Sequence, residues 1–149
     1  MEWKVKKFKE LSLDELYSIL QLRSEVFVVE QDCVYQDIDD KDQIAYHVLG
    51  YQKKELIAYA RIFKKGDYFN EASIGRIIVR EAFRKKDVGH HLLDYSINYI
   101  NFTLKEKSIR ISAQKYLIAF YQKHGFQVDG EGYLEDGIPH INMLIKDLI

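Results

Sequence analysis

The chain has 149 residues, 47% of them hydrophobic and 30% charged, which is ordinary for a globular protein and enough for one domain with its own core. A formal net charge of −1 gives no general attraction to nucleic acid or to an anionic membrane. The N-terminus lacks the apolar stretch of a signal peptide, and a single cysteine, Cys33, cannot form an internal disulfide. We therefore expect one domain over residues 1–149, with no membrane span and in the cytoplasm.

The first elements that the sequence predicts are a short strand and a capped helix. Trp3, Val5 and Phe8 indicate the strand. Ser12 and Glu15 form a capping box, in which each side chain accepts a hydrogen bond from the backbone of the other. The helix that starts there has apolar residues at helical spacing, which predict one broad buried face. The predicted face consists of Leu16, Ile19, Leu20, Arg23, Val26 and Phe27.

Three strands are predicted in the middle of the chain. Residues 44–51 and 56–63 both read as strands, and the polar residues 52–55 between them predict a hairpin. Residues 64–70 close a second hairpin into a strand over residues 72–79, which is rich in β-branched side chains.

The second half of the chain alternates between helix and strand. The predicted elements are a helix from Val88, a strand over 109–113, a helix over 117–123, and strands near 126–128 and 140–145. Asp136-Gly137 marks a turn before the last strand. This order of elements predicts an α/β (α+β) fold, with a mixed sheet that has helices on both faces.

The most informative segment is the strand over 72–79 together with the helix that follows it. Between them lies a basic turn, Arg84-Lys85-Lys86. The first turn of a helix carries unpaired N–H groups and partial positive charge, and Gly89 lets a ligand approach the backbone there. The segment therefore indicates a phosphate-binding turn; the alternative is that the three basic residues are only a solvated run of charge.

This segment resembles the acetyl-CoA site of the GNAT family of N-acetyltransferases. The family fingerprint is Arg or Gln, two residues, Gly, one residue, and then Gly or Ala. Arg84 and Gly89 match the outer positions, whereas Asp87 stands where the inner glycine is usual. A carboxylate there would repel a diphosphate unless it points away, and Lys85 and Lys86 could offset its charge.

A second segment, residues 114–126, is similar to the later motif of the same family, Asn-x-x-Ala-x-x-Leu-Tyr-x-x-x-Gly-Phe. Tyr121, Gly125 and Phe126 match directly. Gln114, Leu117 and Phe120 replace the Asn, Ala and Leu of the motif. Residues 23–39, 58–61 and 135–140 also look like the ElaA-type branch of the family. The resemblance implies a single-domain GNAT fold, a mostly antiparallel mixed sheet whose central strands splay apart.

The resemblance also implies where acetyl-CoA would bind. Its pantetheine arm would pair, like an added strand, with the main chain of Ile77 and Val79 in the gap between the splayed strands. The alternative is that these two residues are only strand core. The diphosphate would lie on the backbone amides from Lys85 to His90. The full set of expected cofactor-binding residues is Ile77, Val79, Arg84, Lys85, Lys86, Asp87, Val88, Gly89, His90, Gln114, Phe120 and Tyr121.

Tyr121 is the expected general acid, because a phenol with a pKa near 10 is protonated at neutral pH and could protonate the departing CoA sulfur. The alternative is a core tyrosine on an apolar helix face. The general base cannot be read from the sequence. Glu30 and His140 are the catalytic candidates, and Glu30 is preferred because it ends the first helix beside the expected acceptor cleft. The further candidates are His47, Asp37 and Asp39.

The acidic residues of segment 37–42 leave two interpretations open. They form either an anionic rim that attracts a cationic amine or the solvated charge of a loop. A metal site is not expected there, because the glycine and the final glutamate of a calcium-binding loop are missing.

The expected function is direct transfer of an acetyl group from acetyl-CoA to a primary amine, by an enzyme that uses no metal and is a monomer or a homodimer. Two alternatives remain. The first is a non-catalytic acyl-CoA-binding sensor or regulatory module, which the off-pattern Asp87 and Gln114 keep open. The second is an acetyltransferase of protein N-termini or lysines, which differs only in its acceptor.

Overall fold

The computed structural model describes residues 1–148. Its strands are β1 (Glu2–Lys7), β2 (Tyr46–Gln52), β3 (Glu55–Phe63), β4 (Ala72–Val79), β5 (Ile109–Gln114), β6 (Gln127–Val128), β7 (Tyr133–Glu135) and β8 (Ile138–Ile145). Its α-helices are α1 (Leu13–Arg23), α2 (Val88–Asn98) and α3 (Ile118–Gln122). Two π-helical segments, Ser24–Glu30 and Tyr99–Thr103, prolong α1 and α2. Short 3₁₀ turns are formed by Phe8–Glu10, Asp42–Ile44, Glu81–Phe83 and Lys115–Leu117.

All eight strands belong to one mixed sheet, in the order β1-β2-β3-β4-β5-β8-β6, with β7 paired to β8. Only β4 and β5 pair in parallel; the other pairs are antiparallel. The predicted mixed and mostly antiparallel sheet is therefore confirmed.

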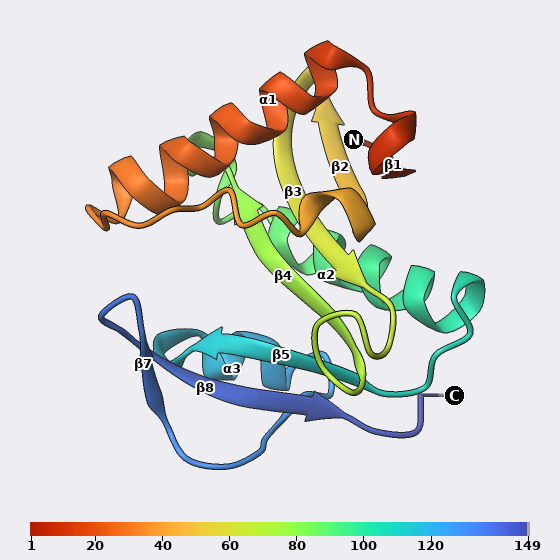
Figure 1. Cartoon of the computed structure of the whole chain (residues 1–149), viewed down its shortest axis with the longest axis vertical. Helices are drawn as coiled ribbons and strands as arrows, with labels where there is room; N and C mark the ends of the chain where they lie inside the picture. Colours follow the sequence, from red (N-terminus) through yellow and green to blue (C-terminus); the bar gives the residue numbers. More distant parts are fainter. Residues whose placement is uncertain (149) are drawn as a thin grey trace.

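The contact between β4 and β5 is short, and this shortness shapes the site. The two strands pair only at Ala72 with Ile109 and at Ser73 with Arg110. Beyond these two pairs the strands diverge, as Figure 1 shows, and β5 continues antiparallel to β8 instead. The edge of β4 over residues 74–79 has no strand partner on that side. The expected splay of the central strands is confirmed.

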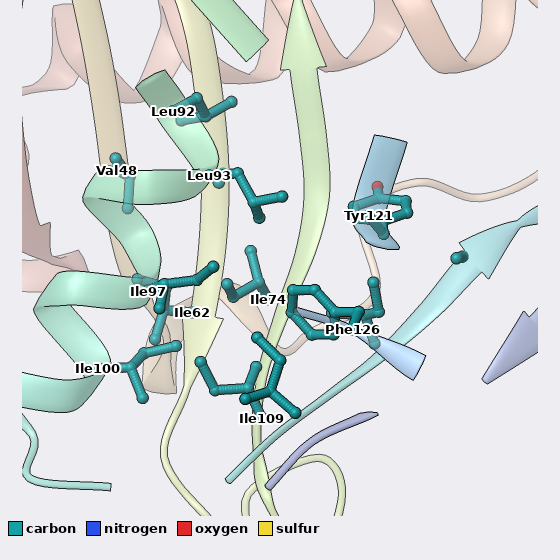
Figure 2. Close-up of a cluster of buried hydrophobic side chains, with 14 of the residues drawn as sticks. Val48, Ile62, Ile74, Leu92, Leu93, Ile97, Ile100, Ile109, Tyr121 and Phe126 are labelled. Atoms are coloured by element: carbon teal, nitrogen blue, oxygen red, sulfur yellow. The ribbon is translucent and has the colours of Figure 1, made fainter. Parts of the chain in front are cut away.

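Helices cover both faces of the sheet, as expected. On one face, α2 and α3 pack against the larger core cluster, and Figure 2 shows Leu93 and Ile97 of α2, and Ile100 of the π-helical segment after it, near Ile62 and Ile74 of the sheet. On the other face, α1 packs against a smaller cluster. The buried residues of this second cluster are Ile19, Leu22, Val26, Leu49, Leu56, Tyr59 and Ile78.

The helix α1 begins as predicted. Ser12 Oγ accepts a hydrogen bond from the Glu15 N–H at 3.0 Å, and Glu15 Oε1 accepts one from the Ser12 N–H at 2.8 Å. The predicted face lacked one position, Leu22, which is fully buried, whereas Leu20 is half-buried. Leu22 lies three residues after Ile19 and so shares its side of the helix.

Three elements differ from the prediction: β2 and α3 in their bounds, and β7 in its presence. The strand β2 begins at Tyr46, because residues 42–44 form a 3₁₀ turn. The helix expected over 117–123 is a 3₁₀ turn followed by the five residues of α3. The strand β7 was not predicted, because three residues are too few for an alternating pattern.

Within residues 1–148, no helix has both the length and the apolar character needed to cross a membrane.

Candidate active site

A cleft of about 620 Å³ opens where β4 and β5 diverge. It is lined by β4, by the turn before α2, by β5 and α3, and by the β7–β8 hairpin. The splay therefore brings together segments that are far apart in the sequence. The sequence-predicted site residues that line it are Glu30, Ile77, Val79, Arg84, Lys85, Asp87, Gly89, His90, Gln114, Phe120, Tyr121 and His140.

Two predicted residues place their side chains elsewhere. Val88 is buried in the core beneath α2. The Lys86 ammonium lies 5.7 Å from the centroid of the Phe83 ring. A role for either residue in binding an anion would therefore rest on its backbone N–H alone.

The turn before α2 has an unusual backbone. Lys85 has φ +64° and Asp87 has φ +62°, both in the left-handed region that glycine adopts most easily. Asp87 is the residue immediately before α2, and its exposed carboxylate makes no capping hydrogen bond. The positive φ explains why a glycine suits this position, and Asp is one of the few other residues that tolerate it. The first amides of α2 are thus not capped by Asp87.

Gly89 allows a close approach between α2 and the cleft wall. A Cβ atom at this position would lie 3.4 Å from Phe120 Cζ and 3.8 Å from Val79 Cγ2. A methyl group would therefore fit tightly, whereas a branched side chain would press on the Phe120 ring. The glycine keeps the N-terminus of α2 packed against β4 and α3.

Arg84 and Glu30 form a two-pronged ion pair at the rim of the cleft. Arg84 Nη1 and Nη2 donate to the two Glu30 carboxylate oxygens at 2.6 and 3.0 Å, and Arg84 Nε donates to the Val79 carbonyl at 2.8 Å. Arg84 thereby ties the end of β4 to the end of the π-helical segment. Both carboxylate oxygens of Glu30 already accept from the guanidinium, so an ammonium group would have to compete for them.

Tyr121 lies on α3 with its side chain almost completely buried at the wall of the cleft. Its ring contacts Phe120 and Phe126 at centroid distances of 5.2 and 6.0 Å, both edge to face. Figure 2 shows it near Phe126, on the same face of the sheet as α2. Burial raises the pKa of this phenol above its ordinary value, because the charged phenolate is poorly solvated there. The group therefore stays protonated at neutral pH.

His140 belongs to a polar network that lines the opposite side of the cleft. Its Nδ1–H donates to the Ile138 carbonyl at 2.7 Å, which leaves Nε2 as the acceptor of the neutral ring. Nε2 lies 3.4 Å from Glu135 Oε2. The Ser112 hydroxyl bonds both to the Tyr133 hydroxyl and to the Glu135 carboxylate. The buried imidazole thus has a carboxylate beside its free nitrogen.

Glu135 was missed by the reading of the sequence. It lies on β7, directly opposite Ile138 in the β7–β8 hairpin. The turn at Asp136-Gly137 that was predicted is the one that folds Glu135 back onto β8. The sequence therefore indicated the turn at Asp136-Gly137, but the strand β7, which carries Glu135, is too short to be predicted.

The anionic-rim interpretation of segment 37–42 is wrong for three of its four aspartates. These three carboxylates are paired with arginines that come from α1, β3 and β4. The pairs are Arg23 with Asp37 and Asp42, Arg61 with Asp39 and Asp42, and Arg76 with Asp37 and Asp39. The cluster holds the loop to the sheet instead of presenting negative charge to a ligand.

The position of His47 excludes it as the general base. It is fully buried, its Nδ1 contacts the Tyr59 hydroxyl at 2.6 Å, and its Nε2 lies 2.9 Å from the Asp42 carbonyl. It does not line the cleft. Burial also lowers its pKa, so the ring is neutral at pH 7.

Arg76 sits on a bulge of β4 that no local pattern predicted. Between the pairs Tyr59–Ile78 and Arg61–Gly75, β4 has one residue more than β3. Arg76 itself has φ +49° and turns its guanidinium over the Tyr35 ring, 5.8 Å from the centroid. The bulge thus bends β4 where it leaves β5 and adds a cation to the cleft wall.

Comparison with known proteins agrees with this geometry. A model of the acetyltransferase (GNAT) domain matches residues 9–146. Protein ElaA of Escherichia coli (strain K12) is 46% identical over 145 residues, which cover 96% of this chain and 95% of that protein. A UPF0039 protein, sll0451, of Synechocystis is 33% identical, with 98% and 96% coverage.

Solved structures show the same fold. An acyl-CoA N-acyltransferase from Pseudomonas aeruginosa superimposes with a TM-score of 0.91 at 37% identity, over 97% of this chain and 99% of that one. Escherichia coli ElaA gives 0.91 at 43% identity, over 98% and 100%. A GNAT acetyltransferase from Elizabethkingia anophelis, solved with acetyl-CoA bound, gives 0.65 at 16% identity, over 97% of each chain, and shares the fold. This chain therefore belongs to the GNAT family of acetyltransferases, in its ElaA-type branch, and is an acyltransferase.

Proposed function

We propose that this protein transfers an acetyl group directly from acetyl-CoA to a primary amine. The observation that carries the proposal is the splay of β4 and β5, which opens a cleft between the uncapped N-terminus of α2 and the buried phenol of Tyr121. A helix N-terminus suits a diphosphate, and a protonated phenol suits a leaving thiolate. The acetyl-CoA in the Elizabethkingia relative supports the same ligand for this fold.

The cleft fits an extended thioester cofactor. Unpaired main chain of β4 beyond Ser73 faces the gap, so a pantetheine arm alongside Ile77 and Val79 would satisfy groups that are costly to leave without partners. The diphosphate would meet the amides from Lys85 to His90. The side-chain role expected for Arg84 changes in this proposal, because the ion pair with Glu30 makes Arg84 the support of the turn.

The reaction needs one bond to form and one to break. The amine nitrogen attacks the thioester carbonyl carbon, a C–N bond forms, and the C–S bond then breaks. Tyr121 gives its proton to the departing sulfur. Among residues 1–148, no group accepts a hydrogen bond from the Tyr121 hydroxyl, so the proton is available for that step.

We propose His140 as the base that takes the proton from the amine. Its neutral Nε2 carries a lone pair, it lines the cleft, and Glu135 would stabilise the imidazolium that forms. Glu30 was the preferred base from the sequence. Its ion pair with Arg84 favours His140 instead.

Asp87 provides a test of the diphosphate position. Because its carboxylate is exposed beside the first amides of α2, removing that charge should raise the affinity for CoA about two- to fivefold. Asp87→Asn isolates the charge, and Asp87→Gly also frees the positive φ. Isothermal calorimetry with CoA at two salt concentrations measures the change. An unchanged affinity in both variants would place the diphosphate elsewhere.

The decisive experiment for the proposed function is titration with acetyl-CoA. We expect the wild-type protein to bind one equivalent. Gly89→Val should weaken binding at least about tenfold, because the branched side chain would push Phe120 into the ligand path, whereas Gly89→Ala should have a small effect. Thermal unfolding of both variants controls for loss of fold. Absence of binding by the wild-type protein would overturn the proposal.

The acceptor is then found by measuring release of free CoA thiol with small amines, polyamines and lysine-containing peptides. Thiol release with one class identifies the acceptor. Acetyl-CoA binding without release of CoA thiol in the presence of any class of amine would mean an acyl-CoA sensor.

We also propose that the protein works in the reducing cytoplasm, because the side chain of its only cysteine, Cys33, is a free thiol.

A further inference from the structure

Two histidines and an aspartate form a chain of hydrogen bonds beside the cleft. His90 Nδ1 lies 2.8 Å from His124 Nε2, and His124 Nδ1 lies 2.9 Å from Asp94 Oδ1. His90 and Asp94 are one turn apart on α2, whereas His124 follows α3 and is 34 residues from His90. The chain therefore links the helix that begins at the diphosphate turn to the helix that carries Tyr121.

The side chains around this chain are packed in a defined way. His90 lies in the first turn of α2 and lines the cleft. The Phe120 ring contacts both imidazoles, at centroid distances of 4.7 and 5.6 Å, and the planes of the two imidazoles are only 24° apart. The side chain of His124 is 7% exposed, whereas that of its partner Asp94 is 61% exposed, so the chain runs from the half-buried His90 to a carboxylate at the surface. The hydrogen bonds and the contacts with Phe120 thus hold both rings in place.

The partners fix the tautomer of each ring. The Asp94 carboxylate can only accept, so His124 Nδ1 carries a proton, and in the neutral ring Nε2 is then the acceptor. His90 Nδ1 must then be the donor. The one nitrogen left over is His90 Nε2, which has no partner among residues 1–148. An added proton would therefore enter the chain at Nε2 of the ring that lines the cleft.

We propose that His90 is a proton-dependent ligand of the CoA diphosphate, and that His124 and Asp94 are the positioning residues that hold it in the donating state. This inference rests on the proposed binding of CoA at the N-terminus of α2. When His90 is protonated, Nε2–H donates to a phosphate oxygen and Nδ1–H donates to His124. The charge on the imidazolium is then balanced by the diphosphate on one side and, through His124, by Asp94 on the other.

Other groups near His90 do not replace this role. On the turn before α2, Lys85 and Asp87 line the same cleft with opposite charges, and the Arg84 guanidinium is engaged by Glu30. The β4 and α3 residues nearest to the start of α2 are Val79 and Phe120, which are apolar. Among these groups, His90 is thus the imidazole that lines the cleft at the start of α2.

The sign of the pH effect follows from linkage. Bound diphosphate favours the charged form of His90 and so raises its pKa above that of the free protein. Binding is therefore tightest below the pKa of the free protein and weakens as pH rises through the pKa of the complex. A one-unit rise in pKa corresponds to an affinity about tenfold higher at pH 5.5 than at pH 8.5.

The test uses 3′-dephospho-CoA, whose diphosphate does not itself titrate between those pH values, and calorimetry with the full-length protein. We expect the tenfold ratio for the wild type, a ratio near one for His90→Gln, and about threefold for Asp94→Asn. His91→Gln is the matched control, because His91 neighbours His90 but does not line the cleft, and it should keep the wild-type ratio. NMR of the ¹⁵N-labelled histidines should show protons on Nδ1 of His90 and His124 at pH 8.

The outcomes separate the two proposals. Binding of 3′-dephospho-CoA with the same affinity at both pH values, or with the same ratio in the wild type and in His90→Gln, would overturn the role of His90 and leave the acetyltransferase proposal standing. No binding at any pH would overturn the proposed function itself.

Discussion

Replacing Tyr121 by Phe is expected to lower turnover about 10²- to 10⁴-fold, which is the usual contribution of a positioned general acid. The affinity for acetyl-CoA should stay within about twofold, because the phenyl ring keeps the contacts with Phe120 and Phe126. The measurement is release of CoA thiol with the amine that the acceptor screen identifies, together with calorimetry for binding. Tyr17→Phe, a change at an exposed tyrosine of α1, is the control.

The pH profile distinguishes an acid from a residue that only packs. The rate should rise with pH as the base that accepts the amine proton, which we propose to be His140, becomes available. It should fall again only above the ordinary tyrosine range, since burial raises the pKa of Tyr121. In Tyr121→Phe the upper fall should disappear, and in His140→Asn the lower rise should change. Wild-type turnover in Tyr121→Phe would remove the assigned acid.

Local patterns were sufficient for most of the fold. The capping box at Ser12 and Glu15 and the β-branched run of β4 depend on residues that are close in sequence, and both were predicted correctly. The start of α2 at Val88 follows from the same kind of pattern. The splay of β4 from β5 came from the family resemblance, because no local pattern reports where two strands stop pairing.

The polar partners of the site could not be predicted in the same way. Arg61 and Asp39 are 22 residues apart, and His90 and His124 are 34 apart, so neither pair leaves a periodic signal. Their contacts depend on register and on the bulge at Arg76, which are set by the whole sheet. For this reason an acidic run looked like a free rim although most of its charge is paired.

The buried ion-pair cluster should be the most sensitive point of the fold. Asp42 Oδ1 accepts from Arg23 Nη1 at 2.7 Å and from Arg61 Nη1 at 2.9 Å, and both arginines are almost fully buried. Asp42→Ala would leave two guanidinium groups short of a counter-charge in the interior. Breaking a buried pair in this way costs about 3–5 kcal/mol, so the variant should lose that much free energy of unfolding at pH 7.

An exposed aspartate of the same loop, Asp40, provides the control for Asp42→Ala. Asp40 lies in the same loop with φ +62°, but the hydrogen bond to its exposed side chain comes from Gln43, so Asp40→Asn, which suits that backbone, should change stability by less than about 0.5 kcal/mol. Burial opposes ionisation of Asp39 and Asp42, but hydrogen bonds and charge from the arginines outweigh it. They lower the pKa of Asp42 and bring that of Asp39 to about 2.

Because these folded-state pKa values lie below the unfolded value of about 3.9, the stability that the cluster contributes is fully present above that value. It is lost as pH falls toward about 2. The gap between wild type and Asp42→Ala, measured by urea unfolding followed by circular dichroism, should therefore be constant from pH 7 to 5 and shrink below pH 4. A gap that does not exceed that of Asp40→Asn, or that persists unchanged at pH 2.5, would mean that the carboxylate does not hold the two arginines in the folded state. The loop over residues 37–42 would then owe its position on the sheet to packing alone.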